Sequence, residues 1–271
     1  MDTIPADDAP LVDTHAHIYT LDMPLTATTW HKPPHDASVE QYLQALDEHG
    51  VRHAVLAAAS MYGDYNDYAI DACRKHPRLR TTVIVEPNVD RYVLEQMKAD
   101  GVVGIRFQRR NVDEPPDLTS AEYRRLLRRV VDLGWHVHLH DEGARLPPAI
   151  AAIEASGARL VIDHFGRPTA GLGVNCPSFK AVLESVERGN TWVKLSAGFR
   201  QPSPDVAIEL AAELLKTAGP ERLMWGSDWP FAAYESQVTY QQTIDSFAQW
   251  VPDREARRRI GCETPLAFYF T

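Results

Sequence analysis

Two histidines separated by one residue occupy a strand-like segment near the start of the chain. His15 and His17 lie within Leu-Val-Asp-Thr-His-Ala-His-Ile-Tyr, residues 11–19. Successive side chains of a strand point to opposite faces, so these two imidazoles share one face and can converge on one ligand. Two strand histidines could also be satisfied core residues. Their role therefore depends on what the rest of the chain brings to the same place.

A second segment suited to chemistry, residues 223–230, reads Leu-Met-Trp-Gly-Ser-Asp-Trp-Pro. Its apolar run ends in one carboxylate, Asp228, and Pro230 follows closely, which predicts that a strand stops there. In a parallel barrel the carboxyl ends of all strands meet on one face, and active sites form on that face. The histidine pair and Asp228 would then belong to one active site.

The composition is that of an ordinary globular protein. Of the 271 residues, 44% are hydrophobic and 24% are charged, and we expect one domain over residues 1–271. No apolar run is long enough to cross a bilayer, and the first residues are acidic where a secretory signal would be basic, so we expect a cytoplasmic protein. The formal net charge of −9 argues against nucleic acid or a membrane surface as a partner. The sequence is compatible with a homo-oligomer.

Strand-like and helix-like segments alternate along the chain. We expect eight strands, over residues 11–19, 51–60, 79–86, 102–107, 135–140, 160–165, 192–195 and 222–226. Helical spacing and capping residues place helices between them, and two more helices, at 240–250 and 254–270, end the chain. A doubly wound sheet would usually carry a glycine-rich turn after its first strand, where this chain has the histidine pair. The pattern therefore predicts an α/β fold, a single (β/α)₈ TIM barrel with a C-terminal helical extension.

The predicted strand ends carry most of the residues suited to chemistry, and this concentration favours a functional site over a structural one. They are His15, His17, Ser60, Arg106, His138, His140, His164, Arg167, Ser196, Arg200 and Asp228. The histidines and Asp228 could bind one divalent metal, because imidazole and carboxylate suit zinc or manganese. They could equally polarise a carbonyl group without a metal. The loop over residues 20–37 is longer than a connection needs, and its Trp30, His31 and His35 are expected to cover the site.

Three arginines from three different strand ends indicate an anionic substrate. The planar guanidinium groups of Arg106, Arg167 and Arg200 suit bidentate recognition of carboxylates. In an acidic protein, three such cations facing one pocket favour a small substrate with two carboxylates. The alternative is that each arginine pairs with an acid at the rim, such as Asp163 or Glu142.

The chain resembles the amidohydrolase superfamily through an ordered set of motifs that spans nearly its whole length. These motifs are His15-Ala16-His17, Asp163-His164 and Gly226-Ser227-Asp228-Trp229-Pro230. Within the superfamily, the runs Ile-Asp-His-Phe-Gly-Arg-Pro at 162–168 and Val-Lys-Leu-Ser-Ala-Gly at 193–198 are similar to the branch of sugar and dicarboxylate lactonases. Within this branch, the two runs are most similar to those of the 2-pyrone-4,6-dicarboxylate lactonases.

This resemblance implies a hydrolase that opens a cyclic ester. Asp228 would activate water, and His15, His17 and His164 would polarise the lactone carbonyl. The substrate contacts it implies are Ser60, Arg106, Arg167 and Arg200, together with His140, which falls where the metal-free pyrone branch has a tyrosine. The expected partner is a small anionic lactone.

The chain departs from the family pattern on the fourth strand. Metal-bridged members carry a lysine or glutamate there, where this chain has Gly-Ile-Arg-Phe-Gln at 104–108, so a binuclear centre is not expected. His140 supplies one more potential ligand, so a mononuclear site remains an alternative. Its ligands would be His15, His17, His140 or His164, and Asp228. We favour a lactonase without a metal or other cofactor.

Two alternatives to a metal-free lactonase remain, one with a different catalytic activity and one without catalytic activity. A mononuclear metal enzyme of the same superfamily could be a sugar-type lactonase or a non-oxidative decarboxylase of aromatic acids. A catalytically silent ligand-binding barrel is the third interpretation. Retention of both the histidine pair and Asp228 counts against it, because a scaffold needs neither.

Overall fold

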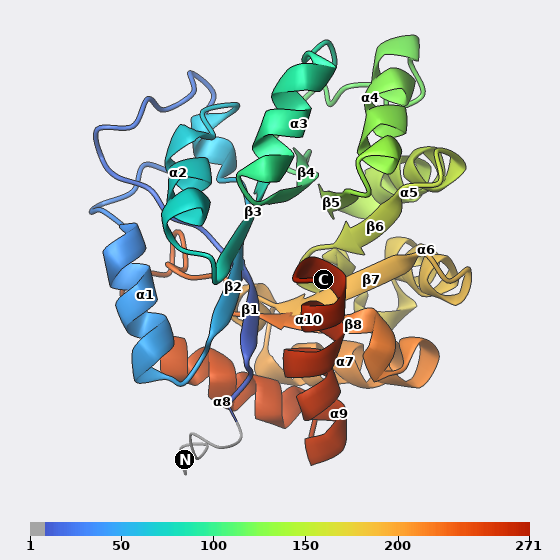
Figure 1. The fold of residues 1–271 in the computed structure, drawn as a ribbon. Coiled ribbons are helices and arrows are strands. Elements are labelled where there is room, and N and C mark those ends of the chain that lie inside the picture. The colour runs from blue at the N-terminus through green and yellow to red at the C-terminus, as the bar shows by residue number, and fades with distance from the viewer. Residues whose placement is uncertain (1–8) are drawn as a thin grey trace.

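In the computed structural model, which describes residues 9–271, eight parallel strands form one sheet that curls into a barrel (Figure 1). Each strand pairs with the next one along the chain, in the order β1 to β8. The strands are β1 (Val12–Ala16), β2 (His53–Leu56), β3 (Leu79–Val83), β4 (Val102–Gln108), β5 (His136–His140), β6 (Arg159–Ile162), β7 (Thr191–Ser196) and β8 (Leu223–Gly226). The predicted (β/α)₈ barrel is confirmed.

The first and last strands lie against each other and close the barrel. Ala16 pairs with Trp229 in a parallel bridge, and the amide of Asp228 donates to the carbonyl oxygen of His15 at 2.8 Å. Gly226 allows this approach, because a Cβ at that position would lie 2.6 Å from Cβ of His15. Closure of the barrel therefore places the histidine pair beside Asp228, which is more than two hundred residues away in the sequence.

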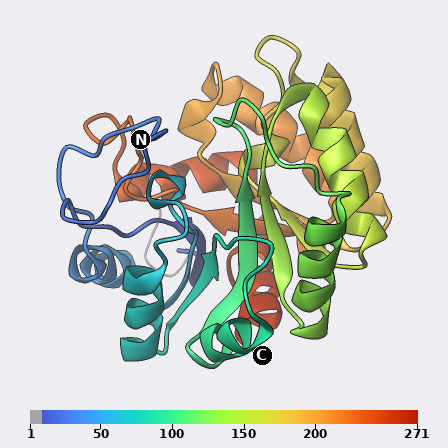
Figure 2. The same cartoon turned by 90° about the horizontal axis from the view of Figure 1, so that it is seen from above.

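Helices surround the strands on the outside of the barrel, as the two views in Figures 1 and 2 show. They are α1 (Val39–Glu48), α2 (Asp67–Lys75), α3 (Arg91–Ala99), α4 (Ala121–Asp132), α5 (Leu146–Ala155), α6 (Pro177–Glu187), α7 (Pro204–Ala218) and α8 (Tyr240–Trp250). Ser38 and Gln41 form a capping box at the start of α1. Ser120 is the N-cap of α4, and its side chain accepts from the amide of Tyr123. In the described residues, none of the helices has the length and apolar character needed to cross a membrane.

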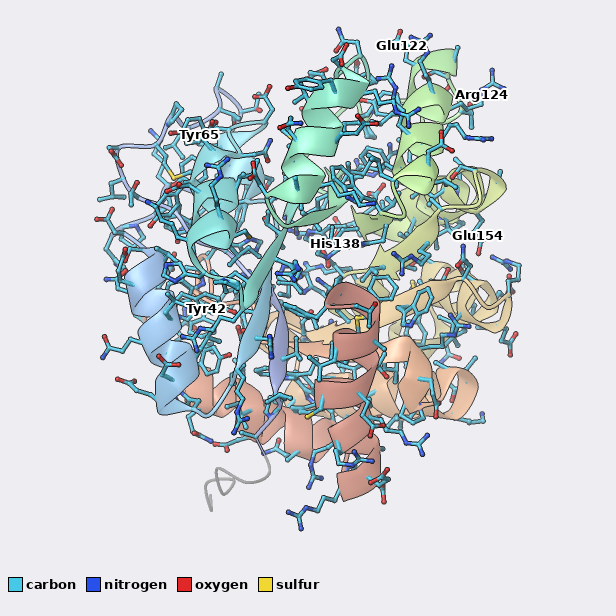
Figure 3. All side chains as sticks on the ribbon, in the orientation of Figure 1. Tyr42, Tyr65, Glu122, Arg124, His138 and Glu154 are labelled. Atoms are coloured by element: carbon cyan, nitrogen blue, oxygen red, sulfur yellow. The ribbon has the colours of Figure 1, made fainter. Side chains whose placement is uncertain are left out.

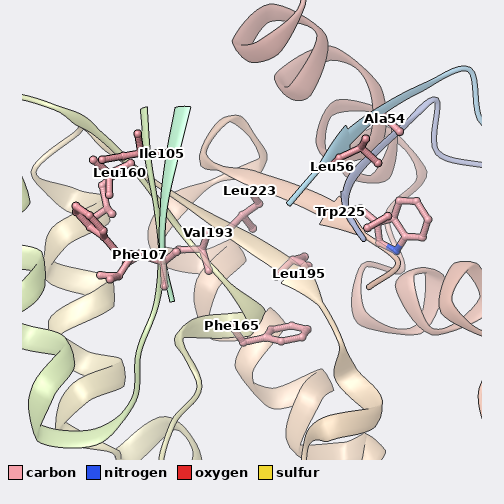
Figure 4. Close-up of a cluster of buried hydrophobic side chains, with 14 of the residues drawn as sticks. Ala54, Leu56, Ile105, Phe107, Leu160, Phe165, Val193, Leu195, Leu223 and Trp225 are labelled. Carbon is pink, nitrogen blue, oxygen red and sulfur yellow. The ribbon is translucent and has the colours of Figure 1, made fainter. Parts of the chain in front are cut away.

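Large apolar side chains fill the space between the strands and the helices. Leu160, Val193, Leu195 and Trp225 are among those that are completely buried (Figure 4). Charged side chains such as Glu122 and Arg124 lie on the outer face of α4, whereas His138 lies inside the barrel (Figure 3). The buried apolar layer holds the strand ends in fixed positions, because side chains in such cores are close-packed.

The C-terminal segment covers the amino ends of the strands. The sequence predicted one helix there, but a π-helical turn (Arg259–Glu263) separates α9 (Arg254–Arg258) from α10 (Thr264–Tyr269). Tyr269 is buried in a cluster with Val55 of β2 and Met224 of β8. With this end of the barrel covered, the carboxyl ends of the strands are left to form a site.

Four predicted strands end earlier than expected: β1, β2, β3 and β6 stop at Ala16, Leu56, Val83 and Ile162. After β6 the backbone of His164 and Phe165 takes left-handed conformations, with φ of 51° and 58°. After β2, Ser60 begins a short 3₁₀ turn and is not a strand residue. The strand pattern alone could not show where β2 stops, because the apolar run continues through residues 57–59.

Candidate active site

A cavity with about 500 Å³ of free space opens at the carboxyl ends of the strands. Eight of the nine residues predicted for the site line it, namely His17, Ser60, Arg106, His140, His164, Arg167, Arg200 and Asp228. The ninth, His15, is fully buried next to them. Trp30 of the long loop also lines the cavity, as the sequence predicted for a covering residue. Among the other lining residues, Gln108 and Asn111 were not identified from the sequence.

One carboxylate oxygen of Asp228 faces three imidazole nitrogens. Oδ1 lies 3.5 Å from Nε2 of His15, 3.5 Å from Nε2 of His17 and 3.8 Å from Nε2 of His164. The Nε2 atoms of His15 and His17 are 3.3 Å apart. The two strand histidines therefore converge on one point beside Asp228.

The opposite ring nitrogens of the histidine pair differ in their partners. Nδ1 of His17 lies 2.7 Å from the carbonyl oxygen of Ala57, and a carbonyl oxygen can only accept a hydrogen bond. In the neutral ring of His17 the proton is therefore on Nδ1, and the Nε2 lone pair points towards His15 and Asp228. Nδ1 of His15 lies 3.2 Å from Oδ1 of Asp163 but makes no hydrogen bond to the described residues, so Nε2 of His15 can donate to Nε2 of His17.

The protonation states at neutral pH follow from burial. Burial lowers the pKa of His15 to about 3 and holds the pKa of His164 well below its usual value. Burial by itself would raise the pKa of Asp228, but the positive charge of Arg200 and the neighbouring His164 and His17 outweigh it and hold that pKa well below its usual range. Near pH 7 His15 and His164 are thus neutral, whereas Asp228 is ionised.

These donor atoms fit a single divalent cation. His15, His17 and Asp228 offer one ligand atom each, all within 4.8 Å of one another, and so do His15, Asp163 and His164. The Nε2 lone pair of His17 lies 3.5 Å from the anionic oxygen of Asp228, and positive charge between these two atoms would stabilise them. Neutral imidazole and carboxylate are ligands that zinc and manganese accept.

His140 does not belong to either of these groups of potential ligands. Its ring packs edge-to-face on that of His164, with the centroids 5.0 Å apart. Neither of its ring nitrogens has a hydrogen-bond partner among the described residues. His140 lines the cavity with a free donor and a free acceptor, which suits contact with a substrate.

Two of the three predicted substrate arginines are paired with acids of the site. Arg106 donates to Oδ2 of Asp163 at 3.0 Å and to the carbonyl oxygen of Ala58 at 2.7 Å. Nε of Arg200 lies 2.8 Å from Oδ2 of Asp228. The alternative considered from the sequence, pairing with a neighbouring acid, therefore applies to both. They still line the cavity.

Arg167 differs from these two arginines. In the part of the chain that the structure describes, its guanidinium makes no hydrogen bond and no ion pair. Burial lowers its pKa to about 10, and the positive charges of Arg110 and Arg200 lower it further in the same direction. An unpaired, partly desolvated cation gains most from an anion, so Arg167 is the residue of the cavity best prepared to bind one.

A buried polar layer lies beneath the cavity. Asp163 accepts from Nε2 of His138, in addition to its contacts with His15 and Arg106. His138, His15 and Arg106 together outweigh burial and hold the pKa of Asp163 well below its usual value. His138 is one of the strand-end residues named from the sequence, and its alternation with His140 along β5 places both side chains on the inner face.

Lys194 of β7 belongs to the same layer. Its side chain is completely buried and its Nζ donates to the carbonyl oxygen of Thr14. Burial lowers the pKa of Lys194 to about 7. A lysine inside an otherwise apolar strand was visible in the sequence, but its direction into the barrel was not.

Comparison with known proteins gives consistent matches over almost the whole chain. Residues 12–271 match the model of a family described as Amidohydrolase. The chain is 28% identical over 267 residues to 4-sulfomuconolactone hydrolase of Hydrogenophaga intermedia, a match that covers 95% of this chain and 88% of that protein. It is 27% identical over 281 residues to 2-pyrone-4,6-dicarboxylate hydrolase of Comamonas testosteroni, covering 97% and 90%. A solved structure from Pseudomonas putida, assigned as a 2-pyrone-4,6-dicarboxylic acid hydrolase, superimposes with a TM-score of 0.89 at 35% identity, covering 96% of this chain and 97% of that one.

Proposed function

The chain belongs to the amidohydrolase family, and we propose that it hydrolyses a cyclic ester, a lactone that carries carboxylate or similar anionic groups. The observation that carries this proposal is an ionised carboxylate, Asp228, that faces neutral imidazoles on one side of a cavity whose other residues include the unpaired Arg167. Such a site combines a base for water with a receptor for an anion.

Asp228 is the base in this proposal. Its Oδ1 faces the cavity while Oδ2 is held by Arg200, so one oxygen is free to take a proton from a water molecule. The hydroxide formed in this way attacks the lactone carbonyl, and the ring opens when the bond to the ring oxygen breaks.

The carbonyl oxygen needs a donor where negative charge develops. His164 can serve, because its Nδ1 lies 2.8 Å from the hydroxyl of Ser196. When that hydroxyl donates to Nδ1, Nε2 carries the proton and can donate to the carbonyl oxygen. His17 is poorly suited to donate from Nε2, since its Nδ1 faces the carbonyl oxygen of Ala57 and carries the proton in the neutral ring.

His15, His17 and Asp228 are instead the residues that would hold a divalent cation. When bound there, zinc or manganese would supply Lewis-acid polarisation and a lower pKa for water. His15 and His17 have their second nitrogens engaged by Asp163 and by the carbonyl of residue 57, as metal-binding histidines usually do. This geometry speaks for the mononuclear alternative against the metal-free site favoured from the sequence.

The anionic part of the substrate binds to the arginines. Arg167 provides an unpaired guanidinium, and Arg110 and Arg200 add positive charge around it. The relatives support this assignment, since one is named for a sulfonated lactone and another for a dicarboxylated pyrone. Ser60 and His140 line the same cavity and are proposed to complete the contacts.

The test is a panel of lactones with and without carboxylate or sulfonate groups, assayed by the acid released on ring opening. We expect turnover of the anionic lactones, with kcat/KM at least about 10-fold above that of neutral analogues of the same ring size, because each charge-assisted contact stabilises the complex. Turnover that the Asp228→Asn variant retains, or a preference for neutral lactones, would contradict the proposal. Release of carbon dioxide from aromatic acids without ring opening would support the decarboxylase alternative.

A further inference from the structure

A second cavity adjoins the catalytic cavity. It has about 810 Å³ of free space, and five residues line both cavities: Trp30, Ser60, Arg106, Gln108 and Asn111. The indole nitrogen of Trp30 donates to the hydroxyl of Ser60 at 3.4 Å, so these two residues form part of the boundary between the cavities. We call this second cavity the side chamber.

Apolar side chains from three elements line the side chamber. Phe107 of β4 and Tyr123 of α4 pack edge-to-face with their centroids 5.8 Å apart. Ile84 and Val85 follow β3, and Val112 lies in the loop between β4 and α4. A chamber lined in this way favours an apolar group, because removal of apolar surface from water is favourable.

The charges of the side chamber are the reverse of those in the catalytic cavity. Its arginines are already paired, Arg106 with Asp163 and Arg109 with Asp141 at 2.9 Å. Glu86 also lines it and makes no side-chain hydrogen bond or ion pair within the described residues. The catalytic cavity presents an unpaired cation, whereas the side chamber presents an unpaired anion.

We propose that the side chamber holds a neutral, apolar arm of the lactone, while the anionic group of the same molecule binds at Arg167. This inference rests on the proposed function and narrows its substrate class. A compact lactone would leave the chamber filled with water, and a second anionic arm there would face Glu86. The substrate class is therefore an anionic lactone whose ring carries an aryl or alkyl substituent.

The binding test uses cyclopentanone carboxylates, which have the shape of the lactone but no ester bond. Dissociation constants of the wild-type protein are measured by calorimetry for three probes: one without an arm, one with a phenyl arm and one with a carboxyphenyl arm. We expect the phenyl arm to tighten binding by about 10-fold or more, the range for burial of one aromatic ring, and the carboxyphenyl arm to give no such gain. An arm that leaves the dissociation constant unchanged would overturn the proposal.

Two substitutions locate the arm. Val112→Trp fills the chamber and should abolish the gain from the phenyl arm without changing the affinity of the probe that lacks one. Val93→Trp adds the same side chain on the exposed face of α3, outside both cavities, and should retain the gain. Equal affinities of the two variants for the phenyl probe would place the arm elsewhere.

Reversal of the charge at residue 86 should tighten the binding of one probe. Misfolding cannot produce this result, because a misfolded protein would lose affinity. Glu86→Lys should bind the carboxyphenyl probe about 10-fold more tightly than the wild type does, since it supplies a charge-assisted contact. Glu114→Lys, on the same side of the molecule but outside the chamber, is the matched control and should show no change. No gain in Glu86→Lys would contradict the assignment of the arm to this chamber.

These binding measurements are independent of turnover. If the protein hydrolyses no lactone but distinguishes the three probes as described, the proposed function is wrong, whereas the assignment of the apolar arm to the side chamber is upheld. If the protein hydrolyses anionic lactones but the arm has no effect on either affinity or kcat/KM, the proposed function is upheld, whereas the assignment of the apolar arm to the side chamber is wrong.

Discussion

The Nε atom of Arg200 lies 2.8 Å from Oδ2 of Asp228, so one oxygen of the central carboxylate is fixed by a guanidinium. The other oxygen faces the imidazoles of His15 and His17 at 3.5 Å. Arg200 follows β7 and Asp228 follows β8, so this ion pair joins two neighbouring strand ends. One carboxylate oxygen is therefore held by the protein, and the other can take part in a reaction.

Asp228→Asn should fold normally and lose at least about 10²-fold in kcat, the lower range for removal of an acid–base group. An amide keeps the shape of the side chain but cannot take a proton from water. Steady-state kinetics with an anionic lactone, together with a thermal melt, would measure both effects. If Asp228 only stabilised its turn, asparagine would substitute with most of kcat retained, and the mechanism would be wrong.

Arg200→Met should move the acid limb of the kcat profile to higher pH. Asp228 works as a base only when ionised, and its pKa is held well below its usual range by Arg200 and its neighbouring histidines. In the wild type, activity should therefore persist as the pH falls towards about 4, the ordinary pKa of an aspartate. Without the guanidinium the carboxylate takes up a proton at a higher pH, and the loss of activity begins earlier.

The matched control for this profile is Arg52→Met, because Arg52 is exposed and lies outside the cavity. It should leave the acid limb in place. An acid limb at the same pH in Arg200→Met and in the wild type would show that Arg200 does not set the ionisation of Asp228. A rise in KM in Arg200→Met is also expected, because Arg200 lines the cavity.

Arg167→Met should weaken substrate binding without unfolding the protein. Arg167 has no ion pair within the described part of the chain, so its loss removes a contact with the substrate and no internal one. The lost charge-assisted contact should cost on the order of 1.5–3 kcal/mol, seen as a higher KM with kcat little changed. An unchanged KM for a dianionic lactone would refute this role.

Arg106→Met should lower the stability of the folded protein, which Arg167→Met should leave unchanged. Arg106 is buried and pairs with Asp163, so its removal leaves a buried carboxylate without its guanidinium partner. We expect a loss of about 3–5 kcal/mol in the free energy of unfolding, measured by urea denaturation. A melt like that of Arg167→Met would show that the ion pair beneath the cavity contributes little.

Protein purified without chelator should contain close to one zinc or manganese ion per chain. Nε2 of His15, Nε2 of His17 and Oδ1 of Asp228 lie 3.3–3.5 Å from one another, an arrangement that a divalent cation stabilises. Elemental analysis measures the stoichiometry, and His17→Ala should reduce it, because one ligand is lost. Absence of metal from a protein that hydrolyses lactones, with activity that resists chelation, would instead establish the metal-free site expected from the sequence.

The sequence by itself determined the barrel and the membership of its site. Eight apolar strand segments alternate with helices, and the carboxyl ends of parallel strands must meet on one face. Polar residues at those ends, such as His17, Arg167 and Asp228, therefore had to line the same cavity wherever the strands began and ended. Gln108 was not identified because the predicted fourth strand ended at residue 107, one residue before it, and Asn111 was not identified because its loop carries no such periodic signal.

Only the tertiary structure decided what each charged residue does within that cavity. Arg106, Arg167 and Arg200 are equivalent in sequence pattern, yet two of them are paired and Arg167 is not. The difference arises because an ion pair depends on distances of a few ångströms between strand ends that are far apart in the chain. The position of the proton on His17 has the same origin, since it is set by the carbonyl oxygen of Ala57 in the segment after β2. The sequence pattern determines on which face of a strand a side chain lies. The packing of the closed barrel determines with which residue that side chain pairs.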